Sequence, residues 1–162
     1  MELWPLACVT LLGMILAALS IIDLRTGYLP DPLQIALAVT GAAVAIAGSP
    51  VGVSWQMALA GAAVNGAVFF AMRWIVSRMK GREAMGFGDV KLVAAGGLWV
   101  GPLALPYIMA AGGILTLLGV ALVSLVTRRA IWKGEMPLGP GLAVGIFACF
   151  VAALFNLPGV TL

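Results

Sequence analysis

The 162-residue chain contains no histidine and only two cysteines, Cys8 and Cys149. Without histidine, neither a Ser-His-Asp triad nor a Cys-His pair can form. The cysteines lie in apolar stretches near opposite ends of the chain and form no CxxC motif, so they offer no zinc site. We therefore expect no metal and no cofactor, and we interpret both cysteines as packing residues.

Charged residues are also scarce, at 9% of the chain, whereas 63% of the residues are hydrophobic. The mean hydropathy is +1.14. Apolar stretches of about 20 residues, the length that crosses the hydrocarbon core of a bilayer, recur along the chain. The composition predicts an all-α, polytopic membrane protein with about six transmembrane helices in one bundle, and residues 1–162 as a single domain.

The apolar pattern predicts six spans, of which the fourth is short: 3–22, 33–48, 55–77, 88–101, 103–126 and 138–156. A signal peptide would begin with a basic segment, but this chain begins with Met1 and Glu2 and continues directly into apolar residues. We therefore interpret the first apolar stretch as a retained membrane span.

The basic residues all fall at the same end of the predicted spans. There are nine: Arg25, Arg73, Arg78, Lys80, Arg82, Lys91, Arg128, Arg129 and Lys133. The opposite connections, residues 48–54 and 100–102, carry no charge. Because Lys and Arg in short loops favour the cytoplasm, the basic side is predicted to be cytoplasmic. Topology and anionic headgroups thus explain the net charge of +3, and we expect no nucleic-acid partner.

Four of the six acidic residues have ordinary explanations. Glu2 is terminal, and Glu83 and Glu135 lie in basic loops, where we expect them to be solvated. Asp31 precedes Pro32 at the start of the second span. This pattern predicts a helix N-cap followed by proline at the first helical position.

The other two acids, Asp23 and Asp89, stand at the end of the first span and at the start of the fourth. The predicted topology places both at the same membrane face, where an ionisable residue is a functional candidate. Two carboxyl groups in a poorly solvated site do not both ionise readily, so one holds a proton while the other acts as a base. Such a pair can activate water against a peptide carbonyl, and we predict that Asp23 and Asp89 are catalytic.

The segment before Asp89 is Gly86-Phe87-Gly88. Glycines beside the acid would let an extended substrate backbone approach, so these three residues are predicted to bind substrate. The alternative is a flexible helix start in which Asp89 is a capping acid stabilised by the helix dipole. Lys91 is two positions beyond the acid and points away from it on a helix, so we expect its side chain to reach the headgroups.

Two stretches, "IDLRTGYLPD" (22–31) and "GFGDVKLVAAGGLWVG" (86–101), resemble motifs of the type IV prepilin peptidase family, the GxGD intramembrane aspartic proteases. A third stretch, "PLGPGL" (137–142), is similar to the family's Pro-aromatic-Gly-Pro motif, with Leu138 in place of the aromatic residue. The resemblance implies that Asp23 and Asp89 are the catalytic pair. It also implies cleavage of the leader peptide of type IV prepilins or pseudopilins, in pilus assembly or protein secretion, at the cytoplasmic face of the cell membrane.

Longer members of that family carry an insertion with paired CxxC motifs and also N-methylate the new amino terminus. This chain resembles a short form without that region, so peptidase activity is expected and methyltransferase activity is not. The subgroup, the particular prepilin and the oligomeric state stay open.

Three alternatives compete with this function, one of them a purely structural assembly subunit, which would tolerate the loss of either acid. A presenilin-like protease would place tyrosine before the first aspartate and contain Pro-Ala-Leu, but Ile22 precedes Asp23 and that tripeptide is absent. A small transporter would use Asp23 and Asp89 to carry protons or cations. Its acids should lie near the bilayer midplane, whereas these lie at span ends.

Overall fold

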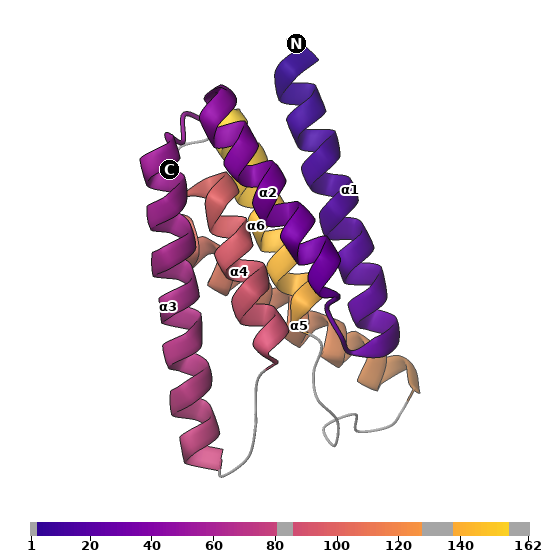
Figure 1. The fold of residues 1–162 in the computed structure, drawn as a ribbon. Coiled ribbons are helices and arrows are strands. Elements are labelled where there is room, and N and C mark those ends of the chain that lie inside the picture. The colour runs from indigo at the N-terminus through magenta and orange to yellow at the C-terminus, as the bar shows by residue number, and fades with distance from the viewer. Residues whose placement is uncertain (1–2, 81–85, 128–137, 156–162) are drawn as a thin grey trace.

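The computed structural model describes residues 3–80, 86–127 and 138–155, which form six helices running in alternating directions (Figure 1). In chain order they are α1 (Leu3–Thr26), α2 (Asp31–Gly48), α3 (Trp55–Lys80), α4 (Phe87–Val100), α5 (Leu105–Thr127) and α6 (Gly139–Leu154). The predicted all-helical architecture is confirmed, and the bounds differ from the predicted spans by a few residues.

The turn between α1 and α2 is built by glycine and proline. Helix α1 ends at Thr26 because Gly27 adopts a positive φ of 65°, and the Gly27 N–H donates to the Asp23 carbonyl at 2.8 Å. Pro32 lies in the first turn of α2, where its missing N–H has no helical partner to lose. Because α1 runs to Thr26, Asp23 lies within its last turn.

The N-cap prediction for Asp31 is wrong. Helix α2 begins at Asp31 itself, its N-cap is Pro30, and no side chain makes a capping hydrogen bond. The Asp31 carboxylate is instead paired with the ammonium group of Lys91 at 2.7 Å. The lysine, expected to reach the headgroups, therefore joins α4 to α2. Sequence alone did not reveal this partner because it depends on the register between two helices.

Helix α4 is the central helix and packs against α2, α3 and α6. Its contact with α3 is so close that a Cβ added to Gly97 would lie 2.5 Å from the Gly61 carbonyl group. Helices α5 and α6 meet in the same way, since a Cβ on Gly141 would lie 2.5 Å from the carbonyl oxygen of Gly112. The small residues thus allow backbone contact between helices.

Two buried polar side chains fasten α4 to its neighbours. The Trp99 indole N–H donates to the Leu37 carbonyl at 2.9 Å, and the Asn65 side-chain amide donates to the Gly101 carbonyl at 3.3 Å. These anchors were not predicted. Cys8 and Cys149 lie in the hydrophobic core, as expected.

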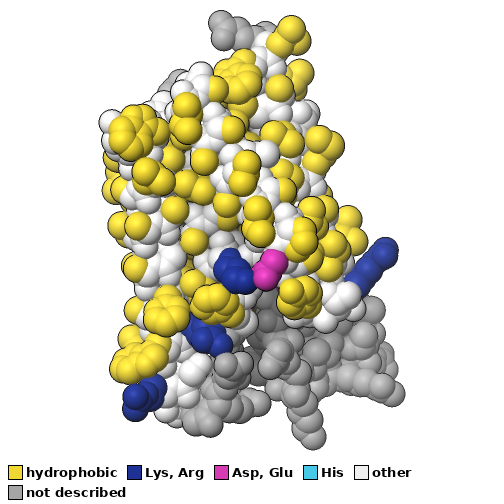
Figure 2. Space-filling view, viewed as in Figure 1, with side chains coloured by type: hydrophobic (Ala, Val, Ile, Leu, Met, Phe, Trp, Pro, Cys, Tyr) yellow, Lys and Arg dark blue, Asp and Glu magenta, His cyan; other side chains and the backbone are white. Residues whose placement is uncertain are grey.

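The outer surface is apolar, and helices α1, α2, α3 and α5 are long and apolar enough to cross a membrane. Large hydrophobic side chains cover most of the face in Figure 2, and Lys and Arg are confined to its lower half. That half is the end where α1 and α3 finish and where α2 and α4 begin (Figure 1). We conclude that the chain is a multi-pass membrane protein.

The prediction that all basic residues share one side can be compared with only part of the chain. Arg25, Arg73, Arg78 and Lys91 lie toward the same end of the bundle. The predictions for eight other charged residues concern side chains that the structure does not describe: Glu2, Lys80, Arg82, Glu83, Arg128, Arg129, Lys133 and Glu135.

Candidate active site

The first predicted catalytic residue, Asp23, is buried in the last turn of α1, with 6% of its surface exposed. The backbone N–H of Gly139, the first residue of α6, faces its carboxyl group. The Oδ2 atom has no hydrogen-bond partner among the described residues. A Cβ at Gly139 would lie 2.5 Å from this oxygen, so only glycine fits at the start of α6 without moving the acid.

The second predicted residue, Asp89, lies in the first turn of α4 with 8% of its surface exposed. It is close enough to Asp23 for the two charges to interact. Residues 66 positions apart in the sequence are therefore brought together where one helix ends and another begins. Two carboxyl groups in so little water repel when both are ionised, so the pair favours a state that shares one proton.

The three residues predicted to bind substrate have different surroundings. Among the described residues, a Cβ at Gly86 would meet the Asp89 Oδ2 atom at 3.6 Å and the Gly88 nitrogen at 3.9 Å, both ordinary contact distances. At Gly88, by contrast, a Cβ would lie 3.1 Å from the Cβ of Leu29. The missing side chain of Gly88 thus lets α4 pack against the α1–α2 turn, whereas Gly86 lies directly beside the acid.

Phe87 lies on the outside of α4, with 47% of its surface exposed. Its ring centre is 5.5 Å from the Arg73 guanidinium and 5.4 Å from the Lys91 ammonium, both within cation–π range. The aromatic ring therefore gathers positive charge at the same end of the molecule as the acid pair.

Gln34 was missed by the sequence reasoning. It lies in α2 with only 4% of its surface exposed, and its side-chain N–H donates to the Leu29 carbonyl at 3.3 Å. The signal was present, because a polar residue inside an apolar span is a functional candidate in the same way as a charged one.

Nothing in the described ranges gathers three or more Cys, Asp or Glu side chains as a metal site would. The polar groups that the described residues place at this site are the carboxyl groups of Asp23 and Asp89, the backbone N–H of Gly139 and the side-chain amide of Gln34.

Fold and site together define a class: a helical membrane bundle with two interacting, buried aspartates where its helices begin and end. The chain belongs to the type IV leader peptidase family, whose sequence profile matches residues 10–125, a stretch that includes both aspartates. The resemblance seen in the motifs is therefore confirmed.

Individual relatives agree with this assignment. The chain is 36% identical over 154 residues to the "Type 4 prepilin-like proteins leader peptide-processing enzyme" of Escherichia coli O78:H11, covering 94% of this chain and 54% of that protein. It is 36% identical over 136 residues to a "Prepilin leader peptidase/N-methyltransferase" of Burkholderia pseudomallei, covering 80% of this chain and 41% of that protein. A protein of the same name from Aeromonas hydrophila is 34% identical over 142 residues, with coverage of 87% and 48%.

The chain spans about half the length of the curated relatives it matches. No solved structure matches it.

Proposed function

We propose that the protein is an aspartic endopeptidase that removes the leader peptide of type IV prepilins or pseudopilins. The observation that carries this proposal is the buried pair of interacting carboxyl groups, Asp23 and Asp89. The names of the relatives, which are leader peptidases of prepilins, support the choice of substrate.

The proposed reaction begins with one carboxyl group protonated and the other ionised. The ionised group takes a proton from water, and the resulting hydroxide attacks the scissile carbonyl carbon while the protonated group gives its proton to the carbonyl oxygen. In the second step the C–N bond breaks, the leaving nitrogen receives a proton from one carboxyl group, and a carbonyl forms again as a hydroxyl of the intermediate gives its proton to the other carboxylate. The products are a carboxyl terminus on the leader and an amine on the mature protein, and the pair again holds one proton.

We further propose that the substrate backbone lies beside Gly86, where a side chain would otherwise contact the Asp89 carboxyl group. Gly88 shapes that space indirectly, because it lets Leu29 pack against the start of α4. The exposed ring of Phe87 borders the same region. All three residues thus act in substrate binding. Gly86 and Gly88 lie beside Asp89, and Phe87 lies at the edge of the binding region.

The site is proposed to work at the cytoplasmic face of the cell membrane. Support comes from the basic residues, because Arg25, Arg73, Arg78 and Lys91 gather at the same end of the bundle as the acid pair. Positively charged loops are retained on the cytoplasmic side. Its partners would be the prepilin and the surrounding lipid.

The test is co-expression with a full-length prepilin from Aeromonas hydrophila, comparing wild type with Asp23→Asn and Asp89→Asn. Each variant should lose cleavage by at least about 1000-fold, because an amide can neither take nor give the proton. Both should accumulate in the membrane at the wild-type level. Leader removal is followed by the mobility shift of the pilin and by its new amino terminus.

The matched control is Arg25→Gln, which removes a charge from an exposed side chain within one turn of Asp23. It should cleave at the wild-type rate. Continued cleavage by either asparagine variant would contradict the two-carboxyl mechanism. A wild-type protein that inserts but cleaves no prepilin would contradict the proposed function and favour a proton-carrying role.

A further inference from the structure

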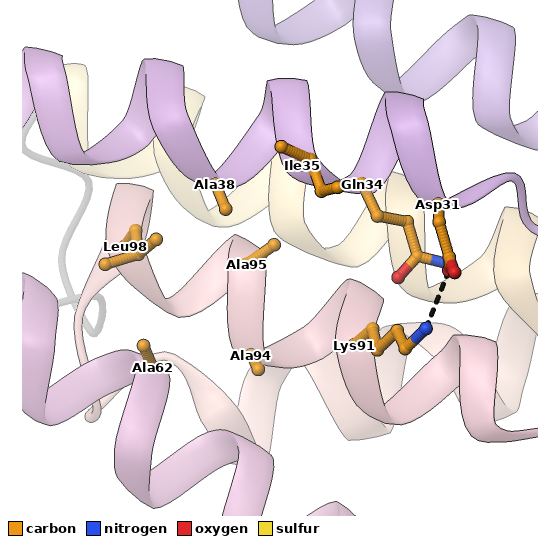
Figure 3. A pocket seen from close by; sticks show the side chains of 9 residues that line it. All are labelled: Asp31, Gln34, Ile35, Ala38, Ala62, Lys91, Ala94, Ala95 and Leu98. Carbon is orange, nitrogen blue, oxygen red and sulfur yellow. Dashed lines mark hydrogen bonds and ion pairs between the residues drawn. The ribbon is translucent and has the colours of Figure 1, made fainter.

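A cavity of about 370 Å³ lies between α2, α3 and α4 (Figure 3). Its walls are mainly small and apolar, with Ala38 from α2, Ala62 from α3, and Ala94 and Ala95 from α4. We call this cavity the alanine groove. Alanine methyl groups leave room that larger side chains would fill, and a volume of this size accommodates a few apolar side chains but not a whole helix.

The polar side chains of the groove gather at one of its ends, where Gln34, Asp31 and Lys91 lie close together (Figure 3). The ion pair satisfies Asp31 and Lys91, and both are substantially exposed. Gln34 differs because it is buried and only half satisfied. Its Nε2 atom donates to Leu29, while its Oε1 atom has no partner among the described residues.

An unpartnered amide oxygen in this position has a cost. A buried polar atom without a hydrogen bond destabilises a fold, and lipid supplies no donor. The hydrogen bond from Nε2 to the Leu29 carbonyl accounts for the amide nitrogen but not for the oxygen. The carbonyl oxygen of Gln34 therefore needs an explanation that packing does not provide.

Gln34 also connects the groove to the acid pair. A Cβ at Gly88 would lie 3.5 Å from its Nε2 atom, and Gly88 directly precedes Asp89. Gln34 thus lies beside the residue that precedes Asp89. An extended substrate backbone bound there would present N–H groups that require acceptors.

We propose that the alanine groove holds the apolar residues of the substrate that lie next to the scissile bond, and that Gln34 Oε1 accepts a hydrogen bond from the substrate backbone there. Gln34 is then a substrate-positioning residue that determines affinity. The inference rests on the proposed peptidase function and adds the part of the substrate that is bound and the group that binds it.

The first test measures steady-state cleavage of the Aeromonas hydrophila prepilin in detergent by wild type, Gln34→Met and Gln56→Met. Methionine keeps the length of the side chain but removes both the acceptor oxygen and the Nε2 donor to Leu29. Losing one backbone hydrogen bond should raise KM about tenfold while kcat stays within about twofold. The control changes the other glutamine of the chain, which is exposed at the start of α3 and should leave both constants unchanged.

A merely structural role for Gln34 would instead lower the yield of folded protein and leave KM alone. An unchanged KM for Gln34→Met, with wild type active, overturns this inference and leaves the proposed function standing. If wild type cleaves no prepilin, both fall together.

A second measurement does not depend on Gln34→Met folding. In an Asp89→Asn background that retains substrate, Ala38→Cys faces the groove, whereas Val39→Cys lies on the exposed side of α2. The native cysteines are buried. A prepilin with one cysteine in the apolar residues beside its cleavage site should form a disulfide with position 38 at least about fivefold faster than with position 39. Equal rates would place the substrate elsewhere and contradict the groove.

Discussion

The two ends of α4 use glycine for opposite purposes. Near its carboxyl end, Gly97 contacts Gly61 so closely that no side-chain atom fits between the two backbones. Near its amino end, Gly86 keeps a side chain away from the Asp89 carboxyl group, and Gly139 of the neighbouring helix makes room for that of Asp23. One set of glycines allows helices to touch, and the other set leaves room for acids.

The polar groups at the two ends differ in charge. Trp99 and Asn65 join the carboxyl end of α4 to its neighbours through neutral hydrogen bonds to main-chain carbonyls, and Asn65 Oδ1 has no partner among the described residues. At the amino end lie the two buried carboxyl groups, those of Asp23 and Asp89. Neutral hydrogen bonds join helices, whereas ionisable groups at the end of a span are costly to bury and are functional candidates. The comparison predicts a graded series of glycine-to-alanine changes.

The largest effect is expected for Gly97→Ala, because its new methyl group would lie 2.5 Å from the Gly61 carbonyl carbon and oxygen. The backbones must move apart, which costs about 3 kcal/mol in overpacking. The midpoint of unfolding in detergent should fall and less protein should accumulate. A variant as stable as wild type would show that α3 and α4 do not depend on this contact.

A smaller effect on stability but a marked effect on activity is expected for Gly139→Ala. Its methyl group would lie 2.5 Å from Asp23 Oδ2 and displace one carboxyl group of the pair. A misplacement of about 1 Å lowers a catalysed rate about 100-fold. Leader cleavage should fall by that factor while the unfolding midpoint stays near the wild-type value. If stability and activity fell together, the difference between the two sets of glycines would be lost.

The smallest effect is expected for Gly119→Ala in α5, where nothing lies within 4 Å of the added Cβ. Alanine is a better helix former than glycine, so the unfolding free energy should be unchanged or rise by up to about 1 kcal/mol. Cleavage should match wild type. A loss of stability here would indicate that this face of α5 is covered by something outside the described contacts.

The helices and the position of the acid pair followed from the sequence for simple reasons. Runs of apolar residues predict where spans begin and end, and alternation of spans predicts that residue 23 and residue 89 share one end. The charge interaction between Asp23 and Asp89 agrees with that expectation. Their catalytic roles stay a prediction until cleavage is measured.

The contacts between helices did not follow from the sequence. The pairing of Asp31 with Lys91, the burial of Gln34 and the approach of Gly139 to Asp23 all depend on how neighbouring helices are rotated and shifted. The lengths of the apolar stretches carry no information on how neighbouring helices are rotated or shifted. Asp31 could have bound either its own helix terminus or a neighbouring lysine, and only the packing of α2 on α4 decides between them.

The shortness of α4 matters for how topology is assigned to proteins of this kind. With 14 residues it is about 21 Å long, well below the thickness of about 30 Å that a lipid-facing helix must match. It tolerates the mismatch because α2, α3 and α6 surround it and lipid does not. A rule that accepts only helices of bilayer length finds four spans in the described residues and would assign Asp89 to a loop. The same rule would also miss α6, which has 16 residues, and it would reverse the assigned direction of α5, because one span fewer would precede it.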